Sequence, residues 1–317
     1  MTGKVFASTE DTAEKQIAVE QVGAGLYAYT ADGDPNSGII VGDDGVMVVD
    51  AQPTPVLAGE LITRVGKVTD KPIKYVLLSH YHASRTLGAS AYQGAEILAS
   101  DMTRGLMAER GKADAESEIA RFPRLFGAAE TIVGPAWPTL TFPDEMSVWL
   151  GRREVRIIHI GRGHTAGDVI AVVPDAGVVF ASDLVEYKTA SYCGDAHFTD
   201  WPATLDNLAE LQANAIVPGR GPALSTPQAA VEAIELTADF ITTLYVSVQD
   251  SVAKGLSLKD AFDFARLAMD PKFKSLALYE HRLPFNVARA YDEARGIERT
   301  EIWTAERDRE IWAALQG

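Results

Sequence analysis

Two histidines one residue apart, His80 and His82, are the first side chains in the sequence whose types and spacing could do chemistry. They follow a short apolar run, residues 73–79, that has the composition of a buried strand. A turn at the end of such a strand can bring both imidazoles to one point, and imidazole is the commonest ligand of zinc and similar metals. Taken alone, the pair is more typical of one core histidine beside one surface histidine.

Three more apolar runs end in polar or glycine-rich loops. The loop over residues 161–168 contains His164, and its glycines let the backbone approach a bound group closely. Asp183 ends the next apolar run, and Arg220 lies in a Pro-Gly-x-Gly-Pro loop. Four polar loops after four apolar strands are far less expected by chance than any one of them, so together they indicate a common site.

The strands that hold these loops belong to a mixed α/β region, residues 20–224. Strands alternate there with fewer helices, and several neighbouring strands are separated by hairpin turns such as residues 43–45. This pattern fits helices outside two β layers better than a doubly wound parallel sheet. A polar arm without apolar periodicity, residues 1–19, precedes this region.

After this region the apolar spacing becomes helical. We expect a C-terminal helical extension, residues 225–317, that serves as a lid, a dimer contact or both. Phe240 and Tyr245 are candidates for a homodimer contact. The helices are predicted at residues 227–253, 257–268, 285–296 and 303–315.

On these motifs the chain resembles the metallo-β-lactamase superfamily, in the right order over about residues 20–224. The resemblance implies an αββα sandwich with a metal site at one edge of the sheets. By position, His80, His82 and His164 correspond to the ligands of the family's first metal. Asp183 corresponds to a carboxylate that is shared between two metals.

The family's second metal site is mostly missing from this sequence. The family's histidine motif reads His-x-His-x-Asp-His, and its Asp and last His fall on Ser84 and Arg85. A further family histidine falls on Arg220. Arginine stays protonated and cannot ligate a cation, so we expect one divalent metal per chain. Of zinc and iron, the two metals compatible with these ligands, we favour zinc.

Three functions are compatible with such a site. The first is a metallohydrolase in which one zinc activates water toward a small ester, thioester or lactone. The second is an Fe(II) oxidoreductase similar to a persulfide dioxygenase, with His80, His164 and Asp183 as a facial triad. The third is a metal-free binding protein that keeps only the fold. We favour the hydrolase, with Asp183 as the catalytic residue that ligates the metal, orients the water or takes its proton.

Two arginines and several neighbouring side chains are candidates for substrate binding. Arg85 and Arg220 could bind an anionic group of the substrate, or could hold the loops by pairing with Asp183. The other candidates are Tyr81, Ser84, Tyr187, His197 and His281.

The composition limits the partners that we expect. The formal net charge is −15, from 29 Lys and Arg against 44 Asp and Glu, which argues against nucleic acid because phosphate binding needs excess positive charge. No apolar run reaches the ~18 residues of a membrane span, and the single cysteine, Cys193, excludes an internal disulfide. The first residues lack the apolar segment of a secretory signal, so we expect a cytoplasmic protein that binds a small molecule.

Overall fold

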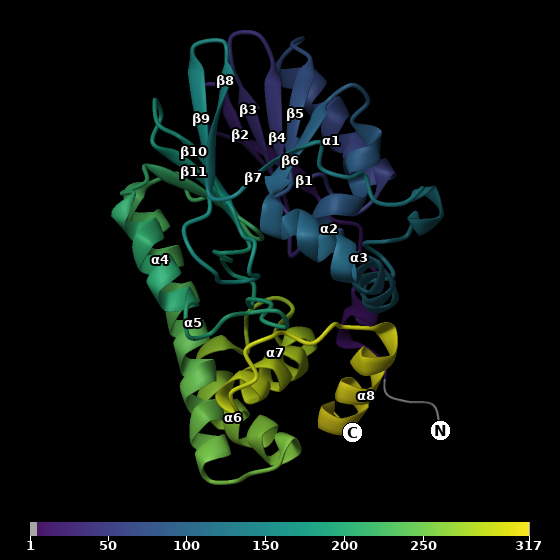
Figure 1. The fold of residues 1–317 in the computed structure, drawn as a ribbon, viewed down its shortest axis with the longest axis vertical. Helices are drawn as coiled ribbons and strands as arrows, with labels where there is room; N and C mark the ends of the chain where they lie inside the picture. The colour runs from purple at the N-terminus through teal and green to yellow at the C-terminus, as the bar shows by residue number, and fades with distance from the viewer. Residues whose placement is uncertain (1–4, 317) are drawn as a thin grey trace.

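Two β-sheets face one another at the centre of the fold, with helices on both outer sides (Figure 1). The computed structural model describes residues 5–316. The first sheet contains, in spatial order, β1 (Ile17–Gly23), β2 (Leu26–Ala31), β3 (Ser37–Val41), β4 (Val46–Val49), β5 (Ile73–Leu77), β6 (Glu96–Ser100) and β7 (Leu140–Phe142). The second contains β12 (Ala215–Pro218), β11 (Val178–Ser182), β10 (Ile170–Val173), β9 (Arg153–Ile158) and β8 (Glu145–Leu150).

The helices cover the outer faces of the sheets and one end of the sandwich (Figure 1). They are α1 (Pro55–Val68), α2 (Ala83–Thr86), α3 (Asp101–Arg121), α4 (Trp201–Glu210), α5 (Pro227–Ala253), α6 (Leu258–Phe273), α7 (Tyr279–Ala294) and α8 (Ala305–Gln316), with short 3-10 turns at Ala7–Glu10, Leu87–Ala91 and Ala129–Thr131. None of the helices within residues 5–316 is long and apolar enough to cross a membrane.

The first sheet changes from antiparallel to parallel pairing half-way across. Strands β1 to β4 form antiparallel pairs, whereas β5, β6 and β7 each pair parallel to the strand before them. The second sheet is antiparallel except for β11 and β12, which are parallel. The ends of β5 and β11 meet at one edge of the sandwich, where Ser79 Oγ donates to Ser182 Oγ at 2.7 Å.

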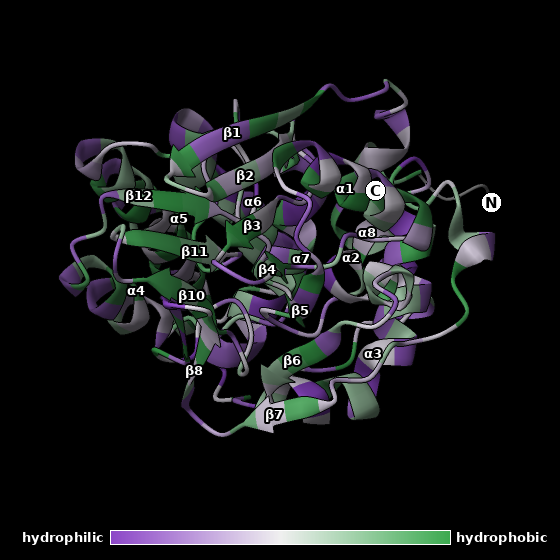
Figure 2. Ribbon diagram, turned by 90° about the horizontal axis from the view of Figure 1, so that it is seen from above, coloured by the Kyte–Doolittle hydropathy of each residue, from purple (hydrophilic) through white to green (hydrophobic). Residues whose placement is uncertain are grey.

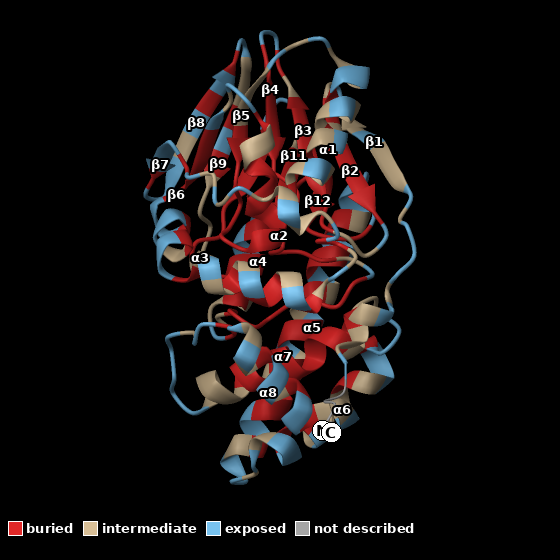
Figure 3. Cartoon of the chain, turned by 90° about the vertical axis from the view of Figure 1, so that its right-hand side faces the viewer, coloured by how far each residue is buried: buried red, intermediate tan, exposed pale blue. Residues whose placement is uncertain are grey.

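Successive side chains of the central strands face different layers of the fold. Along β11, Val178 and Phe180 pack between the two sheets, while Val179 and Ala181 pack against the helices. The central strands are therefore apolar on both faces (Figure 2) and buried (Figure 3). This is the two-layer sheet arrangement with outer helices that the sequence predicts.

The N-terminal residues make more contacts than the expected arm suggests. Residues 1–4 lie outside the described part of the chain. Phe6 packs against aromatic side chains of α7 and α8, and β1 begins at Ile17, inside the expected arm of residues 1–19. One aromatic residue in a polar segment gives no periodic signal, so these contacts could not be predicted from spacing.

Helix α7 begins at Tyr279, so the prediction that it begins at residue 285 is wrong. Pro284 lies directly before the predicted start, and proline lacks a backbone donor and is usually excluded from helix interiors. In the structure Pro284 lies inside the helix. Because proline has no N–H to donate to the carbonyl four residues earlier, the Glu280 carbonyl accepts instead from Gln316 Nε2 at 3.4 Å. Helix α6 likewise continues past its predicted end to Phe273, with Pro271 inside it.

Helix α7 buries His281 in an aromatic cluster that joins the N-terminal residues to the extension. Its ring lies 4.7 Å from that of Phe122, 5.5 Å from Phe285 and 5.7 Å from Trp312, and neither ring nitrogen has a hydrogen-bond partner among residues 5–316. Burial holds the pKa of His281 well below its ordinary value, and the charges of Arg121, Arg282 and Arg220 lower this pKa further. His281 is therefore neutral in the folded protein.

A neutral buried histidine makes folding stability depend on pH. Below pH ~6.5 the unfolded chain binds a proton at His281 that the folded chain does not. The free energy of unfolding therefore has its full value above this pH and decreases as the pH drops further. We expect wild type to lose about 1.3 kcal/mol more than His281→Phe between pH 7 and pH 5.5. Urea unfolding at both pH values measures this difference. Equal losses in the two proteins would show that His281 is not held neutral.

Candidate metal centre

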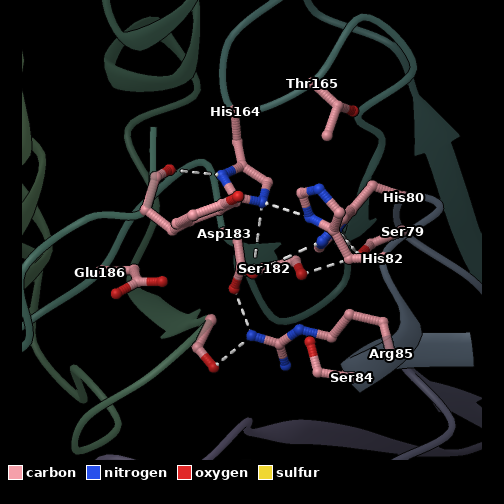
Figure 4. Close-up of polar contacts among 12 residues, drawn as sticks. Ser79, His80, His82, Ser84, Arg85, His164, Thr165, Ser182, Asp183 and Glu186 are labelled. Carbon is pink, nitrogen blue, oxygen red and sulfur yellow. Dashed lines mark hydrogen bonds and ion pairs between the residues drawn. The ribbon is translucent and has the colours of Figure 1, made fainter. Parts of the chain in front are cut away.

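Three histidines from two loops converge at the edge of the sandwich (Figure 4). His80 and His82 lie in the turn between β5 and α2, and His164 lies in the loop between β9 and β10. All three side chains are buried, and their candidate ligand atoms lie within 4.8 Å of one another. The shortest of these separations, 2.9 Å, is between His82 Nδ1 and His164 Nε2.

The ring of His80 is oriented by a chain of hydroxyl groups. His80 Nδ1 lies 2.9 Å from Ser79 Oγ, which donates to Ser182 Oγ, which donates to the Asp50 carboxylate at 2.7 Å. Because both hydroxyl protons are committed in that direction, Ser79 Oγ accepts from His80 Nδ1–H. His80 Nε2 is left with a free lone pair, and it has no hydrogen-bond partner among the described residues.

The other two rings are oriented in the same way by different acceptors. His164 Nδ1 donates to the carbonyl of Tyr192 at 2.8 Å, and His82 Nε2 donates to Asp195 Oδ2 at 3.1 Å. Metal-bound histidines characteristically donate their second nitrogen to such acceptors. Each of the three rings thus directs its remaining nitrogen to a common point, as a three-histidine metal site requires.

The charge states of the rings also suit a metal. Burial lowers the pKa of His80 well below its usual range and that of His164 to about 3, so both imidazoles are neutral. Burial acts in the same direction on His82, but the carboxylates of Asp114, Asp195 and Glu118 outweigh it and raise the pKa of His82 to about 9. Without a metal, His82 carries the proton that bridges to His164, and metal binding releases such protons.

Asp183 faces the same point from the end of β11. Its Oδ2 lies 3.5 Å from His80 Nε2 and 3.6 Å from His164 Nε2, while its Oδ1 accepts from Arg85 Nη2. Burial favours the neutral acid, but the positive charge of Arg85 outweighs it and holds the pKa of Asp183 well below its usual range. A side chain at Gly219 would place its Cβ only 1.8 Å from Asp183 Oδ1, so this glycine makes room for the carboxylate.

Arg85 is fully buried and occupied by protein groups. Besides Asp183, it donates from Nη1 to the carbonyl of Asn36 at 2.7 Å and from Nη2 to that of Gly219 at 2.8 Å. Its Nη1 also lies 3.7 Å from Asp50 Oδ2. These contacts support the structural interpretation of Arg85 over the substrate-binding one.

A small cavity of about 10 Å³ lies beside the histidines. Ser84 and Arg220, both singled out in the sequence, line it together with His82, His164 and Asp183. Ser84 is turned to Glu118, which accepts from its backbone N–H at 2.8 Å. The remaining lining residues, which are not among the site residues predicted from the sequence, are Glu118, Arg121, Phe122, Tyr192 and Arg282.

The other candidate residues lie outside this cavity. The Tyr81 ring packs on that of His82 at 4.4 Å, and half-buried Tyr187 packs against the hydrophobic cluster of the second sheet. His197 is also half-buried, and its backbone N–H donates to the Gly163 carbonyl at 2.9 Å. His281 lies in the aromatic cluster described above.

Comparison with known proteins gives a consistent family. Residues 30–220 match the family model of the metallo-beta-lactamase superfamily. The chain is 21% identical over 266 residues to a linear primary-alkylsulfatase of Pseudomonas sp. (strain ATCC 19151), a match that covers 72% of this chain and 49% of that protein. It is 24% identical over 217 residues to a metallo-beta-lactamase type 2 of Bacillus sp. (strain 170), and this match covers 65% of this chain and 76% of that protein.

Solved structures with a similar fold include proteins of the same kind. A solved metallo-beta-lactamase from Pontibacter korlensis superimposes with a TM-score of 0.57 at 20% identity, over 72% of this chain and 99% of that one. The family match spans well over half of the chain and includes all three histidines, Asp183 and Arg220. The chain therefore belongs to the metallo-beta-lactamase superfamily.

Proposed function

We propose that the protein is a single-metal hydrolase that cleaves an ester bond in a small anionic molecule. The observation that carries the proposal is the convergence of three histidine nitrogens whose partner nitrogens are each hydrogen-bonded to a fixed acceptor. The metal would be held by His80, His82 and His164, with Asp183 beside it.

The relatives support hydrolysis as the class of reaction. They include an alkylsulfatase and several metallo-beta-lactamases, which cleave different bonds. The chain spans about half the length of the alkylsulfatase, so the substrate of that protein does not transfer with the family. An ester of a sulfate or carboxylate is the substrate class that we take to the tests below.

The donor set favours zinc over iron. A facial triad for Fe(II) needs two histidines and one carboxylate, whereas here a third histidine nitrogen, His82 Nδ1, faces the same point. Zinc bound by three histidines acts as a Lewis acid and supplies a hydroxide nucleophile near neutral pH. Three imidazole ligands, with His82 releasing its bridging proton to the solvent, match that preference better than they match iron and oxygen chemistry.

Asp183 has two separate tasks in this proposal. Its Oδ1 is held by Arg85, which fixes the plane of the carboxylate. Its Oδ2 faces the histidine nitrogens and is free to accept a hydrogen bond from the attacking water, and so to orient it. The same Arg85 guanidinium lies where the family motif has its last histidine, so a second cation would meet a fixed positive charge.

Hydrolysis tests the proposal directly. We expect the zinc-loaded full chain to cleave at least one member of a panel of hexyl sulfate, 4-nitrophenyl sulfate, 4-nitrophenyl acetate, a thioester and a lactone. Chelation should abolish the activity and zinc should restore it. Because a metal bound to the folded state stabilises it, chelation should also lower the melting temperature.

Other outcomes of the same assays would contradict the proposal. Oxygen uptake with a glutathione persulfide by iron-loaded protein, with no hydrolysis of the panel, would make the protein an oxidoreductase. Absence of bound metal, with a melting temperature indifferent to chelators, would make it a metal-free binding protein.

The acceptor of His82 should control metal affinity. Asp195→Asn keeps the shape of the side chain but removes the charge that holds His82 Nε2, and loss of such a partner typically weakens metal binding by about 10–100-fold. Competition with a chromophoric chelator measures this change. Asp175→Asn, at an exposed ion pair with Arg153, is the matched control and should leave the affinity unchanged. Equal affinities in both variants would contradict the assigned role of Asp195.

Removal of Arg85 should destabilise the fold as well as the site. Arg85→Met leaves the buried carboxylate of Asp183 without its partner, and breaking a buried pair in this way costs about 3–5 kcal/mol. The free energy of unfolding in urea gives the loss. Arg85→Lys should recover only part of it, because the ammonium cannot reach all three acceptors as the planar fork does. A loss below ~1 kcal/mol in Arg85→Met, the size typical of exposed pairs, would show that Asp183 does not depend on Arg85.

A further inference from the structure

Three buried arginines line the small cavity beside the candidate metal site. Arg121 ends α3, Arg220 follows β12, and Arg282 lies in the first turns of α7. Their exposed fractions are 2%, 4% and 2%, and all three line the same cavity as His82 and His164. Buried arginines are rare unless their charge and N–H groups are satisfied.

Most N–H groups of these arginines have no partner among residues 5–316. The Arg121 side chain makes no hydrogen bond there; its guanidinium lies over the Phe285 ring at 4.8 Å, and its Nε is 3.5 Å from Asp308 Oδ2. Arg220 makes one hydrogen bond, from Nη1 to the Gly33 carbonyl at 2.9 Å. Arg282 uses Nη1 alone, for Glu186 and the Ala190 carbonyl. The Nε atom of each of the three is buried and has no hydrogen-bond partner in the described part of the chain.

Four carboxylates lie near these arginines. Asp183 is held by Arg85, and Glu118 accepts from the backbone N–H of Ser84. Glu186 accepts from Arg282 and lies 3.8 Å from Arg220 Nε, and Asp308 Oδ2 lies 3.5 Å from Arg121 Nε. These acids offset part of the positive charge, but within residues 5–316 none of them accepts a hydrogen bond from Arg121 or Arg220. An oxyanion is the ligand that supplies several acceptors and negative charge together.

We propose that Arg121, Arg220 and Arg282 form an oxyanion-binding subsite for the substrate. The proposal rests on the proposed function, because the same cavity is also lined by His82, His164 and Asp183. Because the arginines line the same cavity as His82, His164 and Asp183, an anion bound there has its charged oxygens close to the atom attacked. The favoured substrates are therefore sulfate or phosphate monoesters, or acyl compounds with a carboxylate next to the scissile carbonyl, and not esters with a remote charge.

Two further cavities are linked in series to the inner one by shared lining residues, and the rest of such a substrate would lie along them. The inner cavity shares Phe122 and Arg220 with a second small cavity, which shares Leu278 with an outer cavity of about 300 Å³. The outer cavity is lined by Leu276, Ala277 and the aromatic Tyr279, among others. The inner cavity holds about one water as it stands, so the Phe122 and Leu278 side chains must shift outward to admit an anion. Leu278 has a left-handed backbone, φ 61°, a strained conformation for a leucine.

Calorimetric titration of the full chain with simple anions tests the subsite. Sodium sulfate, phosphate and acetate would each be titrated into metal-free and zinc-loaded protein, with sodium chloride at matched ionic strength as the blank. We expect saturable binding of at least one oxyanion to both forms. Preference for sulfate or phosphate would indicate a tetrahedral head group, and preference for acetate would indicate a carboxylate.

Variants of the arginines show whether the binding is at the subsite. Arg121→Gln should weaken it at least tenfold, and so should Arg220→Gln from a different element. Because Arg121→Gln leaves Asp308 without its nearest cation, the double variant Arg121→Gln/Asp308→Asn removes both charges and guards against misfolding. Arg152→Gln, at an exposed ion pair with Asp43, is the matched control and should bind as wild type does.

Two results would overturn the subsite. One is that none of the three oxyanions binds to wild type above the chloride blank. The other is that folded Arg121→Gln or the double variant binds as tightly as wild type. The titration needs neither metal nor turnover, so it can succeed where the hydrolysis panel fails, and the panel can succeed where the titration fails.

Discussion

A buried ion pair between Arg85 and Asp183 is the interaction on which the geometry of the site depends. It joins the two sheets, because Arg85 follows β5 of the first sheet and Asp183 follows β11 of the second. Two backbone carbonyls, of Asn36 and Gly219, accept further hydrogen bonds from the same guanidinium. Buried pairs of this kind add little net stability over apolar packing, but removing one partner is costly. Here the pair holds one oxygen of Asp183 so that the other faces the histidines.

The histidines depend on acceptors from distant parts of the chain in the same way. The acceptor of His164 is the Tyr192 carbonyl, and that of His82 is Asp195, both in the loop after β11. This loop is held by the extension: Asn286 of α7 accepts from Cys193 N–H at 2.7 Å and donates to the Ser191 carbonyl at 2.8 Å. Helix α7 therefore contributes to the site, since it holds the residues on either side of Tyr192, whose carbonyl orients His164.

Local signals in the sequence predicted the layers of the fold and the residues at the strand ends. Asp183 follows β11 directly, and His80, His82 and His164 lie in the loops that begin at the ends of β5 and β9. Strand ends at one edge of a sandwich are close together. The orienting residues and the other residues that line the cavity could not be assigned these roles from the sequence, because the roles arise only from tertiary packing. Arg121, in the last turn of a helix, has the sequence character of a surface residue, although it is buried over the Phe285 ring. For Asp195, the sequence offered only an indirect indication. The predicted residue His197 lies in the same loop, two residues away, but it does not line the cavity.

The central claim, that one metal is held by three histidines and that arginine excludes a second, is tested most directly by counting metal. The full chain would be saturated with zinc, separated from free zinc by gel filtration, and analysed for zinc and protein by mass spectrometry and amino-acid analysis. One zinc per chain is the predicted result. Two tightly bound zinc ions per chain would contradict the account, because the position beside Asp183 is assigned to the guanidinium of Arg85.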